Sequence, residues 1–373
     1  MTPQRLDEIL SGFGKARVAV VGDFFLDKYL EIDPALTEIS LETGLEARQV
    51  VAVRCQPGGA GNVAANLRAL GIGEVICVGF IGDDGEGFEL RRALERVGAS
   101  AEHLLSRSDR FTPTYCKPIM LPSRAGDTLL PYGGQDGGVR ELERLDTKNR
   151  QPLPQALEAE LIARVGGLMP GLSAVIAIDQ VQEPECGVIT TGVRVALADL
   201  SATHSRVVSI ADSRTRVGLF RNVMVKLNRR EACAAVHPER PAHEGSVVVG
   251  CAAELSERVG APVFLTMGSE GVAVVTPGRA QRVPTARLEG ELDIVGAGDS
   301  ATAGITSALC AGAGLEEAAI VGNIVASITV QQIGTTGTAT QERVRERLAI
   351  FQQVWSGLPP PDEVRRGTQS HRQ

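Results

Sequence analysis

Short apolar runs bounded by Gly or Asp alternate with longer amphipathic segments along most of the chain. The apolar runs predict buried strands at 17–23, 75–80, 174–178, 207–210, 223–225 and 263–266. Apolar residues spaced by three and four positions predict helices at 5–14, 60–71, 85–97, 154–168, 187–199 and 243–259. This alternation is typical of an α/β fold with a mostly parallel sheet covered on both faces. Ligands of such sheets bind beyond the carboxyl ends of the strands, where Asp23, Asp179, Asp212 and Gly268 fall.

Two segments interrupt the alternation. Residues 29–54 and 113–146 are extended and half-polar, which predicts strands outside the main sheet that form a small β lid over the site. Within the second segment, 122–138 contains Gly and Pro and is expected to be a loop. Residues 1–340 are expected to form one domain, followed by a C-terminal helix and tail at 341–373, whose polar, proline-led end from 359 is expected to be mobile.

Composition narrows the classes of function. The 373 residues are 43% hydrophobic and 22% charged, as in a globular protein of one large domain or two. A net charge of −7 with 3% aromatic residues argues against nucleic acid as a partner. Seven scattered cysteines without a C-x-x-C pair are typical of reduced thiols in the cytoplasm. No secretion signal, membrane-spanning run or structural zinc cluster is expected.

The segment 293–299, Asp-Ile-Val-Gly-Ala-Gly-Asp, precedes a run of small and apolar residues with helical spacing. Gly296, Ala297 and Gly298 leave their backbone N–H groups accessible at the start of this helix, which favours an anion. A carboxylate beside an anion site is expected to take a proton or hold a metal, so Asp299 is a candidate general base for phosphoryl transfer. The alternative is that Asp299 only caps a tightly packed helix.

A second glycine-rich segment, containing Gly58, Gly59 and Asn62, precedes the helix predicted at 60–71. Its glycines permit close approach, and the amide of Asn62 is both donor and acceptor, which suits the hydroxyl groups of a sugar. Asp23 and Asp27 follow the first strand and are candidate acceptors for the same hydroxyls. The alternatives are an N-cap for Asn62 and a solvated turn for the two aspartates.

Two further motifs follow strands of the predicted sheet. Lys226 follows the strand predicted at 223–225. Asn228 and Glu231 are three residues apart, so on a helix they share a face and can orient water on Mg²⁺. The alternative is a capping box made by the same two residues. The segment Thr266-x-Gly268-x-x-Gly271 can lie against phosphates or a ribose, or be a plain β-turn. A P-loop is excluded, because no G-x-x-x-x-G-K-[ST] occurs.

Together these motifs resemble the ribokinase (phosphofructokinase-B-like) family of carbohydrate kinases from about Val18 to about Gly337. The resemblance implies a three-layer α/β sandwich with a β lid from 29–54 and 113–121. It implies Asp299 as the base, and Gly296, Ala297 and Gly298 as the anion hole. Sugar would be bound by Asp23, Asp27, Gly58, Gly59 and Asn62. ATP would contact Lys226, Asn228, Glu231, Thr266, Gly268, Gly271 and Asn323, with Asn228 and Glu231 serving Mg²⁺ through water.

Within the family, the chain looks most similar to the bacterial heptose 7-phosphate kinases, through Val20–Asp23, Leu26-Asp27-x-Tyr29, Thr114-x-x-Lys117 and Arg144–Asp146. The expected partner is a small sugar or sugar phosphate, the expected assembly a homodimer through the lid, and a monovalent cation stays an option. One alternative is a sugar-binding protein without catalysis, which Ile294 and the turn after Asp179 favour because both depart from the family pattern. The other is a kinase for a nucleoside or another small alcohol.

Overall fold

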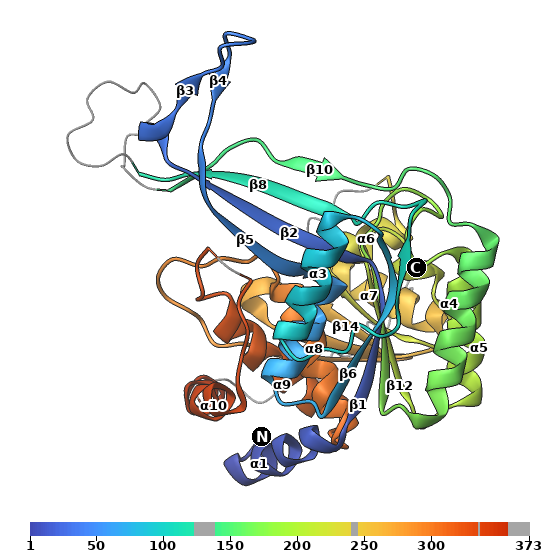
Figure 1. The fold of residues 1–373 in the computed structure, drawn as a ribbon. Helices are drawn as coiled ribbons and strands as arrows, with labels where there is room; N and C mark the ends of the chain where they lie inside the picture. Colours follow the sequence, from blue (N-terminus) through green and yellow to red (C-terminus); the bar gives the residue numbers. More distant parts are fainter. Residues whose placement is uncertain (123–138, 240–244, 335, 357–373) are drawn as a thin grey trace, which may run out of the picture.

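The computed structural model describes residues 1–122, 139–239, 245–334 and 336–356 (Figure 1). Its centre is a nine-stranded sheet in which the seven strands from β14 to β7 run parallel, and β15 and β16 are antiparallel. The strand order is β16 (Arg279–Val283), β15 (Val272–Thr276), β14 (Val263–Thr266), β13 (Met224–Asn228), β12 (Val208–Ser213), β11 (Ala174–Asp179), β1 (Arg17–Gly22), β6 (Glu74–Gly82) and β7 (Leu104–Arg107).

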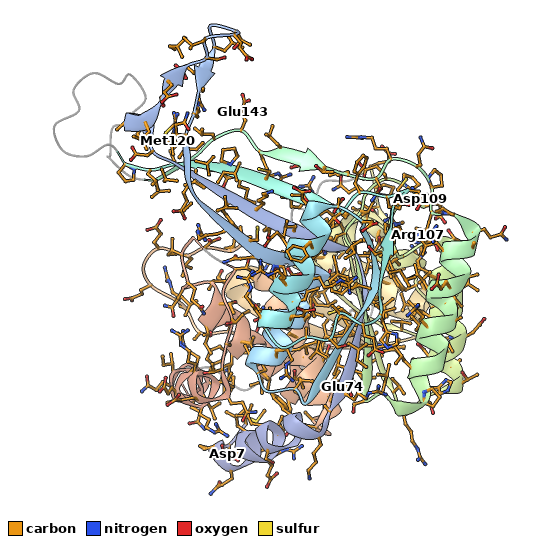
Figure 2. All side chains as sticks on the ribbon, viewed as in Figure 1. Asp7, Glu74, Arg107, Asp109, Met120 and Glu143 are labelled. Atoms are coloured by element: carbon orange, nitrogen blue, oxygen red, sulfur yellow. The ribbon has the colours of Figure 1, made fainter. Side chains whose placement is uncertain are left out.

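Helices cover both faces of this sheet. One layer consists of α1 (Pro3–Gly12), α2 (Ala60–Ala69), α3 (Gly85–Arg96), α8 (Ala297–Cys310), α9 (Leu315–Thr329) and α10 (Gln341–Ser356). The other consists of α4 (Gln155–Leu168), α5 (Thr191–Thr203), α6 (Arg229–Val236) and α7 (Gly245–Val259). Successive strand residues alternate between the layers: Val18 packs in the first core and Ala19 in the second. Side chains occupy the space between the sheet and its helices (Figure 2). The predicted α/β sandwich with a mostly parallel sheet is confirmed.

A second sheet projects from the main one and forms the lid (Figure 1). Its order is β10 (Leu145–Thr147), β8 (Thr114–Met120), β2 (Phe24–Ile32) and β5 (Val50–Gly59), with β9 (Arg140–Glu141) paired to β8. The small hairpin β3 (Glu38–Ile39) and β4 (Glu46–Ala47) extends from its far end. The lid begins at Phe24 and not at residue 29, because the buried rings of Phe24 and Phe25 belong to strand β2 itself.

The other differences from the predicted elements have local causes. Helix α5 begins at Thr191 and not at 187, because Val188 donates its N–H to Asp23 and Thr190 caps the N–H of Val193. Helix α8 begins at Ala297, inside the glycine-rich segment. Strands β15 and β16 were not expected. The expected loop at 122–138 and the expected mobile tail lie almost entirely outside the described residues.

Two expectations from composition concern the described chain as a whole. All seven cysteines are free thiols, and Cys77, Cys186, Cys233 and Cys251 are buried, as expected. Within the described ranges, no helix is both long and apolar enough to pass through a bilayer.

Candidate functional site

Asp299 lies in the first turn of α8, beside the amino end of α2. Gly296 precedes the helix with φ of 79°, a left-handed conformation that favours glycine, and it is the N-cap residue. The Asp299 carboxylate therefore does not cap the helix, so the capping alternative is wrong. Its Oδ2 instead accepts a hydrogen bond of 3.1 Å from Nδ2 of Asn62. By their position in the first turn, the amides of Gly298 and Asp299 have no acceptor within the helix and can bind an anion.

Asn62 is the third residue of α2, whose N-cap is Gly59, so the N-cap alternative for Asn62 is also wrong. Gly59 has φ of 56°, and a Cβ there would lie 2.5 Å from the carbonyl oxygen of Asp23. This close approach brings the start of α2 against the end of β1. The two glycine-rich segments, more than 230 residues apart in sequence, thereby meet at one bond between Asn62 and Asp299.

A buried ion pair lies directly below the start of α8. Lys226 on β13 and Asp212 on the neighbouring strand β12 are opposite each other in the parallel register, and their Nζ and Oδ2 atoms are 2.5 Å apart. Thr302 of α8 donates its hydroxyl to the same Asp212 oxygen at 3.3 Å. A Cβ at Gly298 would lie 3.0 Å from Nζ of Lys226. The small residue at 298 therefore lets the ammonium group lie under the anion-binding turn.

These charges determine the proton affinity of Asp299. Its pKa is raised to about 6, first by burial of the carboxylate and then by the negative charge of Asp212. Lys226, the Asn62 amide and Arg214 act in the opposite direction. A carboxylate that titrates near pH 6 can accept a proton at neutral pH, and such perturbed groups are concentrated at functional sites.

Asn228 and Glu231 form a capping box at the start of α6, as the structural alternative predicted. The Glu231 N–H donates to Oδ1 of Asn228 at 3.0 Å, and the Asn228 N–H donates to Oε2 of Glu231 at 2.8 Å. Burial and the neighbouring charge of Asp212 raise the pKa of Glu231. Glu231 and Asp212 are thus close enough to interact across β13. A role of Asn228 and Glu231 toward Mg²⁺ stays a prediction.

Asp23 holds a loop that follows β11. Its buried carboxylate accepts the N–H groups of Gln180, Val181 and Val188 at 2.7–3.0 Å. Burial, followed by the charge of Asp179, raises its pKa to about 6. The solvated-turn alternative is therefore wrong for Asp23. Three donors leave about one acceptor position of the carboxylate open. Asp23 therefore holds the loop, and direct sugar binding by Asp23 stays a prediction.

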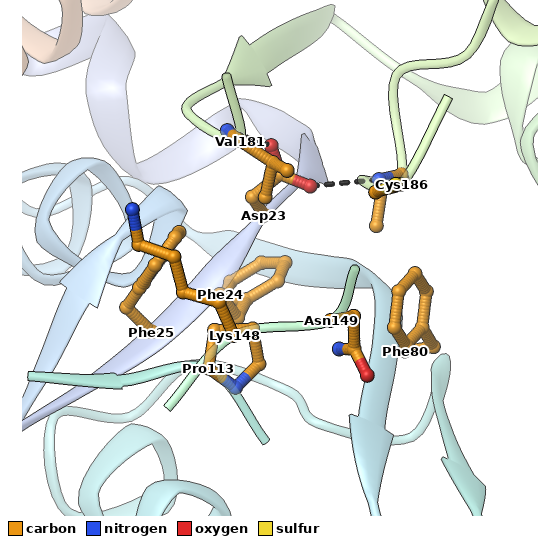
Figure 3. Close-up of a pocket in the computed structure, with 10 residues that line it drawn as sticks. Asp23, Phe24, Phe25, Phe80, Pro113, Lys148, Asn149, Val181 and Cys186 are labelled. Atoms are coloured by element: carbon orange, nitrogen blue, oxygen red, sulfur yellow. Dashed lines mark hydrogen bonds between the residues drawn. The ribbon is translucent and has the colours of Figure 1, made fainter. Parts of the chain in front are cut away.

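A cavity of about 10 Å³ adjoins Asp23 and the loop (Figure 3). Its wall includes the rings of Phe24, Phe25 and Phe80 together with Lys148 and Asn149. One water needs roughly 10–15 Å³. The cavity is therefore too small for a sugar.

Asp27 extends from β2 on the lid side. It is buried, so a solvated turn is wrong here too, and its Oδ1 lies 3.3 Å from Nζ of Lys117 on β8. Burial raises the pKa of Asp27, and Lys117 opposes that shift. A Cβ at Gly58 would lie 2.9 Å from the Asp27 carboxylate, so the glycine leaves space for this group. Close by, the ring of Tyr115 stacks on Phe25 at 4.9 Å.

The predicted nucleotide segment forms a tight turn between β14 and β15. Gly271 has φ of 91°, and a Cβ there would lie 2.2 Å from the carbonyl oxygen of Val283. Asn323 of α9 donates its amide to that same oxygen at 3.0 Å. Thr266 donates to the carbonyl of Leu227 at 3.2 Å, while Gly268 is open to its surroundings. Gly271, Asn323 and Thr266 therefore build the turn, and nucleotide binding by these residues stays a prediction.

Three groups near Asp299 were not predicted from the sequence as part of the site. Asp212 was placed at the correct edge of the sheet but was given no part in the site, and Thr302 and Arg214 were not considered. Lys226 is two residues before the end of β13 and Asp212 is one residue before the end of β12. Charged residues at the ends of adjacent parallel strands were the signal for their pairing. Only the strand register shows which residues face each other.

Residues 222–342 match the model of the pfkB family of carbohydrate kinases. This range includes Lys226, Asn228, Glu231 and the segment from Gly296 to Asp299.

Similar curated proteins extend over nearly the whole chain. The bifunctional protein HldE of Desulfatibacillum aliphaticivorans is 27% identical over 91% of this chain and 64% of its own length. HldE of Azorhizobium caulinodans is 29% identical over 94% of this chain and 68% of its own length. The chain thus spans about two thirds of the length of these relatives.

Solved structures share the fold at low identity. Phosphofructokinase-2 from Escherichia coli, in complex with substrates and products, gives a TM-score of 0.66 at 18% identity, covering 90% of this chain and 99% of its own. Ribokinase from Arabidopsis thaliana, complexed with ribose and ATP, gives 0.64 at 18% identity with the same coverage. These likenesses show a ribokinase-like fold.

Proposed function

Because the chain carries a pfkB-family carbohydrate kinase domain, we propose that it transfers the γ-phosphoryl group of ATP to a hydroxyl group of heptose 7-phosphate. One observation carries the proposal. The carboxylate of Asp299, with its pKa raised to about 6, lies at the amino end of α8 directly beside free helix amides and above Lys226. A base and an anion site at one point are what phosphoryl transfer to an alcohol requires.

In this proposal each group near Asp299 has a separate task. Asp299 accepts the proton of the attacking hydroxyl group, and the Asn62 amide orients the carboxylate through the bond to Oδ2. The free first-turn amides of Gly298 and Asp299 bind the phosphoryl oxygens, with the positive end of the helix dipole behind them, whereas the N–H of Ala297 already donates to the carbonyl of Ile294. Lys226 adds a positive charge below this turn. Phosphoryl transfer depends mainly on such positioning and charge neutralisation.

The donor set also fits Mg²⁺ bound together with ATP. Among the described residues no group of three or more His, Cys, Asp or Glu side chains could hold a metal alone. Mg²⁺ in phosphotransferases is commonly held by one or two carboxylates, phosphate oxygens and waters. Asp212 and Glu231 supply two such carboxylates beside the anion-binding turn. The ion would neutralise phosphate charge, and the residues from Thr266 to Gly271 would support the nucleotide.

The choice of acceptor rests on the relatives and on the lid. The HldE proteins are described as heptose 7-phosphate kinase/adenylyltransferases and match this chain over most of its length. In the lid, Oδ1 of Asp27 lies 3.3 Å from Nζ of Lys117. In this proposal both groups contact a sugar that is bound by Asn62, next to Asp299, and by the backbone of Gly58 and Gly59. A nucleoside acceptor is a second candidate, since a nucleoside kinase from Methanocaldococcus jannaschii shares the fold at a TM-score of 0.54.

The deciding experiment is coupled ATP turnover on a panel of heptose 7-phosphate, fructose 6-phosphate, neutral sugars and nucleosides with Mg²⁺. Turnover is expected on heptose 7-phosphate. In Asp299→Asn, kcat is expected to fall by roughly 10²–10⁴-fold, the usual contribution of a general base, while calorimetry shows unchanged binding of ATP and acceptor. Near-normal turnover in Asp299→Asn would refute the assignment of the base. No turnover on any acceptor, with a sugar still raising the melting temperature, would favour the sugar-binding protein.

The lid is also the proposed homodimer interface. The hairpin and strand β5 expose large apolar side chains: Leu41 is fully exposed, and Ile39, Leu45 and Val53 are 54–69% exposed. β5 is an edge strand of the lid sheet, with backbone groups available for pairing. A second copy of the lid would cover both the apolar side chains and this edge.

A further inference from the structure

Arg214 lies at the carboxyl edge of the main sheet, just past the end of β12. Its N–H donates to the carbonyl oxygen of Asp179 at 3.2 Å, which continues the pairing of β12 with β11 by one residue. Side chains alternate along an extended strand, so Arg214 is on the same face as Asp212, whereas Ser213 points to Asp179. The Asp212 face is the one covered by α8 and Asp299. Arg214 therefore projects toward the catalytic side of the sheet.

The side chain of Arg214 is bonded to a neutral group, whereas three other cations around the site are paired with carboxylates. Lys226 is paired with Asp212, Arg216 with Asp179, and Lys117 with Asp27. Arg214 is exposed, and its Nε donates to the neutral amide oxygen of Gln180 at 2.6 Å. Across the described ranges no carboxylate lies within ion-pair distance of Arg214. Its charge is not neutralised, although a neutral amide fixes the direction of its guanidinium group.

Three groups on different elements respond to this charge. Arg214 lowers the pKa of Asp299 on α8, of Glu231 on α6, and of Tyr115 on the lid strand β8. In each case it acts against a larger effect of burial, which raises the pKa. The guanidinium group is therefore near both the base and the lid.

We infer that Arg214 binds phosphoryl oxygen atoms in the space between Asp299 and Tyr115, and that Gln180 is the positioning residue for its guanidinium group. The inference rests on the proposed kinase function. An arginine that is fixed at Nε still presents its terminal N–H groups to phosphate, with a planar geometry that matches two oxygens. The oxygens belong either to the phosphoryl group being transferred or to a phosphate carried by the acceptor.

The test compares Arg214→Gln with wild type in steady-state kinetics on heptose 7-phosphate and on the corresponding heptose. If Arg214 binds the transferred group, kcat falls roughly 10- to 100-fold with both acceptors, as for loss of a charge-assisted hydrogen bond. If it binds the acceptor's phosphate, KM for heptose 7-phosphate rises by a similar factor and the kinetics with heptose do not change. Unchanged kcat and KM with both acceptors would overturn the inference.

Three further measurements isolate the role of the charge and of its support. Arg214→Lys keeps the charge without the planar fork, so it should recover only part of the loss. Gln180→Ala should give a smaller effect of the same kind as Arg214→Gln, in the same kinetic constant. Arg206→Gln is the matched control, because Arg206 is an exposed arginine just before the opposite end of β12; its kinetics should equal those of wild type.

A binding measurement separates this inference from the proposed function. If wild type turns over none of the acceptors, the proposed function fails. Calorimetry with Mg-ATP, Mg-ADP and heptose 7-phosphate then tests Arg214 alone. Weaker binding of Mg-ATP or heptose 7-phosphate to Arg214→Gln, with Mg-ADP unaffected, supports a phosphoryl site. Equal affinities of both proteins for all three ligands refute it.

Discussion

The hydrogen bond from Asn62 to Asp299 gives a quantitative test of how the site sets the proton affinity of its base. The Asn62 amide donates to Oδ2 of Asp299 at 3.1 Å and favours the charged carboxylate. In Asn62→Ala this donor is lost, while burial and the charge of Asp212 still favour the neutral acid. The pKa of Asp299 must therefore rise above its wild-type value of about 6.

The size of this rise follows from the strength of the bond. A hydrogen bond to a charged group contributes about 1.5–3 kcal/mol. Asp299 is half-buried, so the lower end applies, and at about 1.4 kcal/mol per unit the pKa should rise by about 1 unit. Protonated Asp299 cannot accept the hydroxyl proton, so the variant loses activity at a higher pH than wild type does. At pH 8 the carboxylates of both proteins are ionised.

The assay is the pH profile of kcat/KM from pH 5 to pH 8.5, which reports the free enzyme. Wild type should lose activity on the acid side with a midpoint near pH 6, and Asn62→Ala about 1 unit higher. Any direct loss of sugar binding lowers the whole profile without moving its midpoint. Asn66→Ala is the control: one turn further along α2, Asn66 donates to the carbonyls of Asn62 and Gly337. An unmoved midpoint in Asn62→Ala would refute this account.

Two further predictions concern the metal and the assembly. Glu231→Gln should raise the Mg²⁺ concentration needed for half-maximal activity with little change in KM for the acceptor. The amide of glutamine keeps an oxygen for the capping box but lacks the negative charge. An unaltered magnesium titration would leave Glu231 as a cap only. On gel filtration wild type should elute at twice the mass of one chain. The double variant Leu41→Glu, Leu45→Glu should elute at the mass of one chain, because charges buried between two lids oppose their pairing. Elution of wild type as a monomer would refute the proposed homodimer.

The sequence alone determined the fold class and the positions of the glycine-rich helix starts. Parallel strands buried on both faces must be continuous apolar runs, so strands such as β1, β11 and β14 were visible without a structure. The glycine-rich turn before Asp299 was equally visible, because a helix that starts at such a turn needs small residues in a fixed order. These are local requirements of the backbone.

The partners of the charged side chains were decided only by the tertiary structure. The sequence did not show that three N–H groups of a loop more than 150 residues away donate to the carboxylate of Asp23. Asp212 received no role from the sequence, yet strand register brings it against Lys226. The residue type at a motif position determines which chemistry its side chain can perform. The charge state and the free hydrogen-bonding capacity of that side chain depend on distant atoms that packing brings within about 3 Å of it.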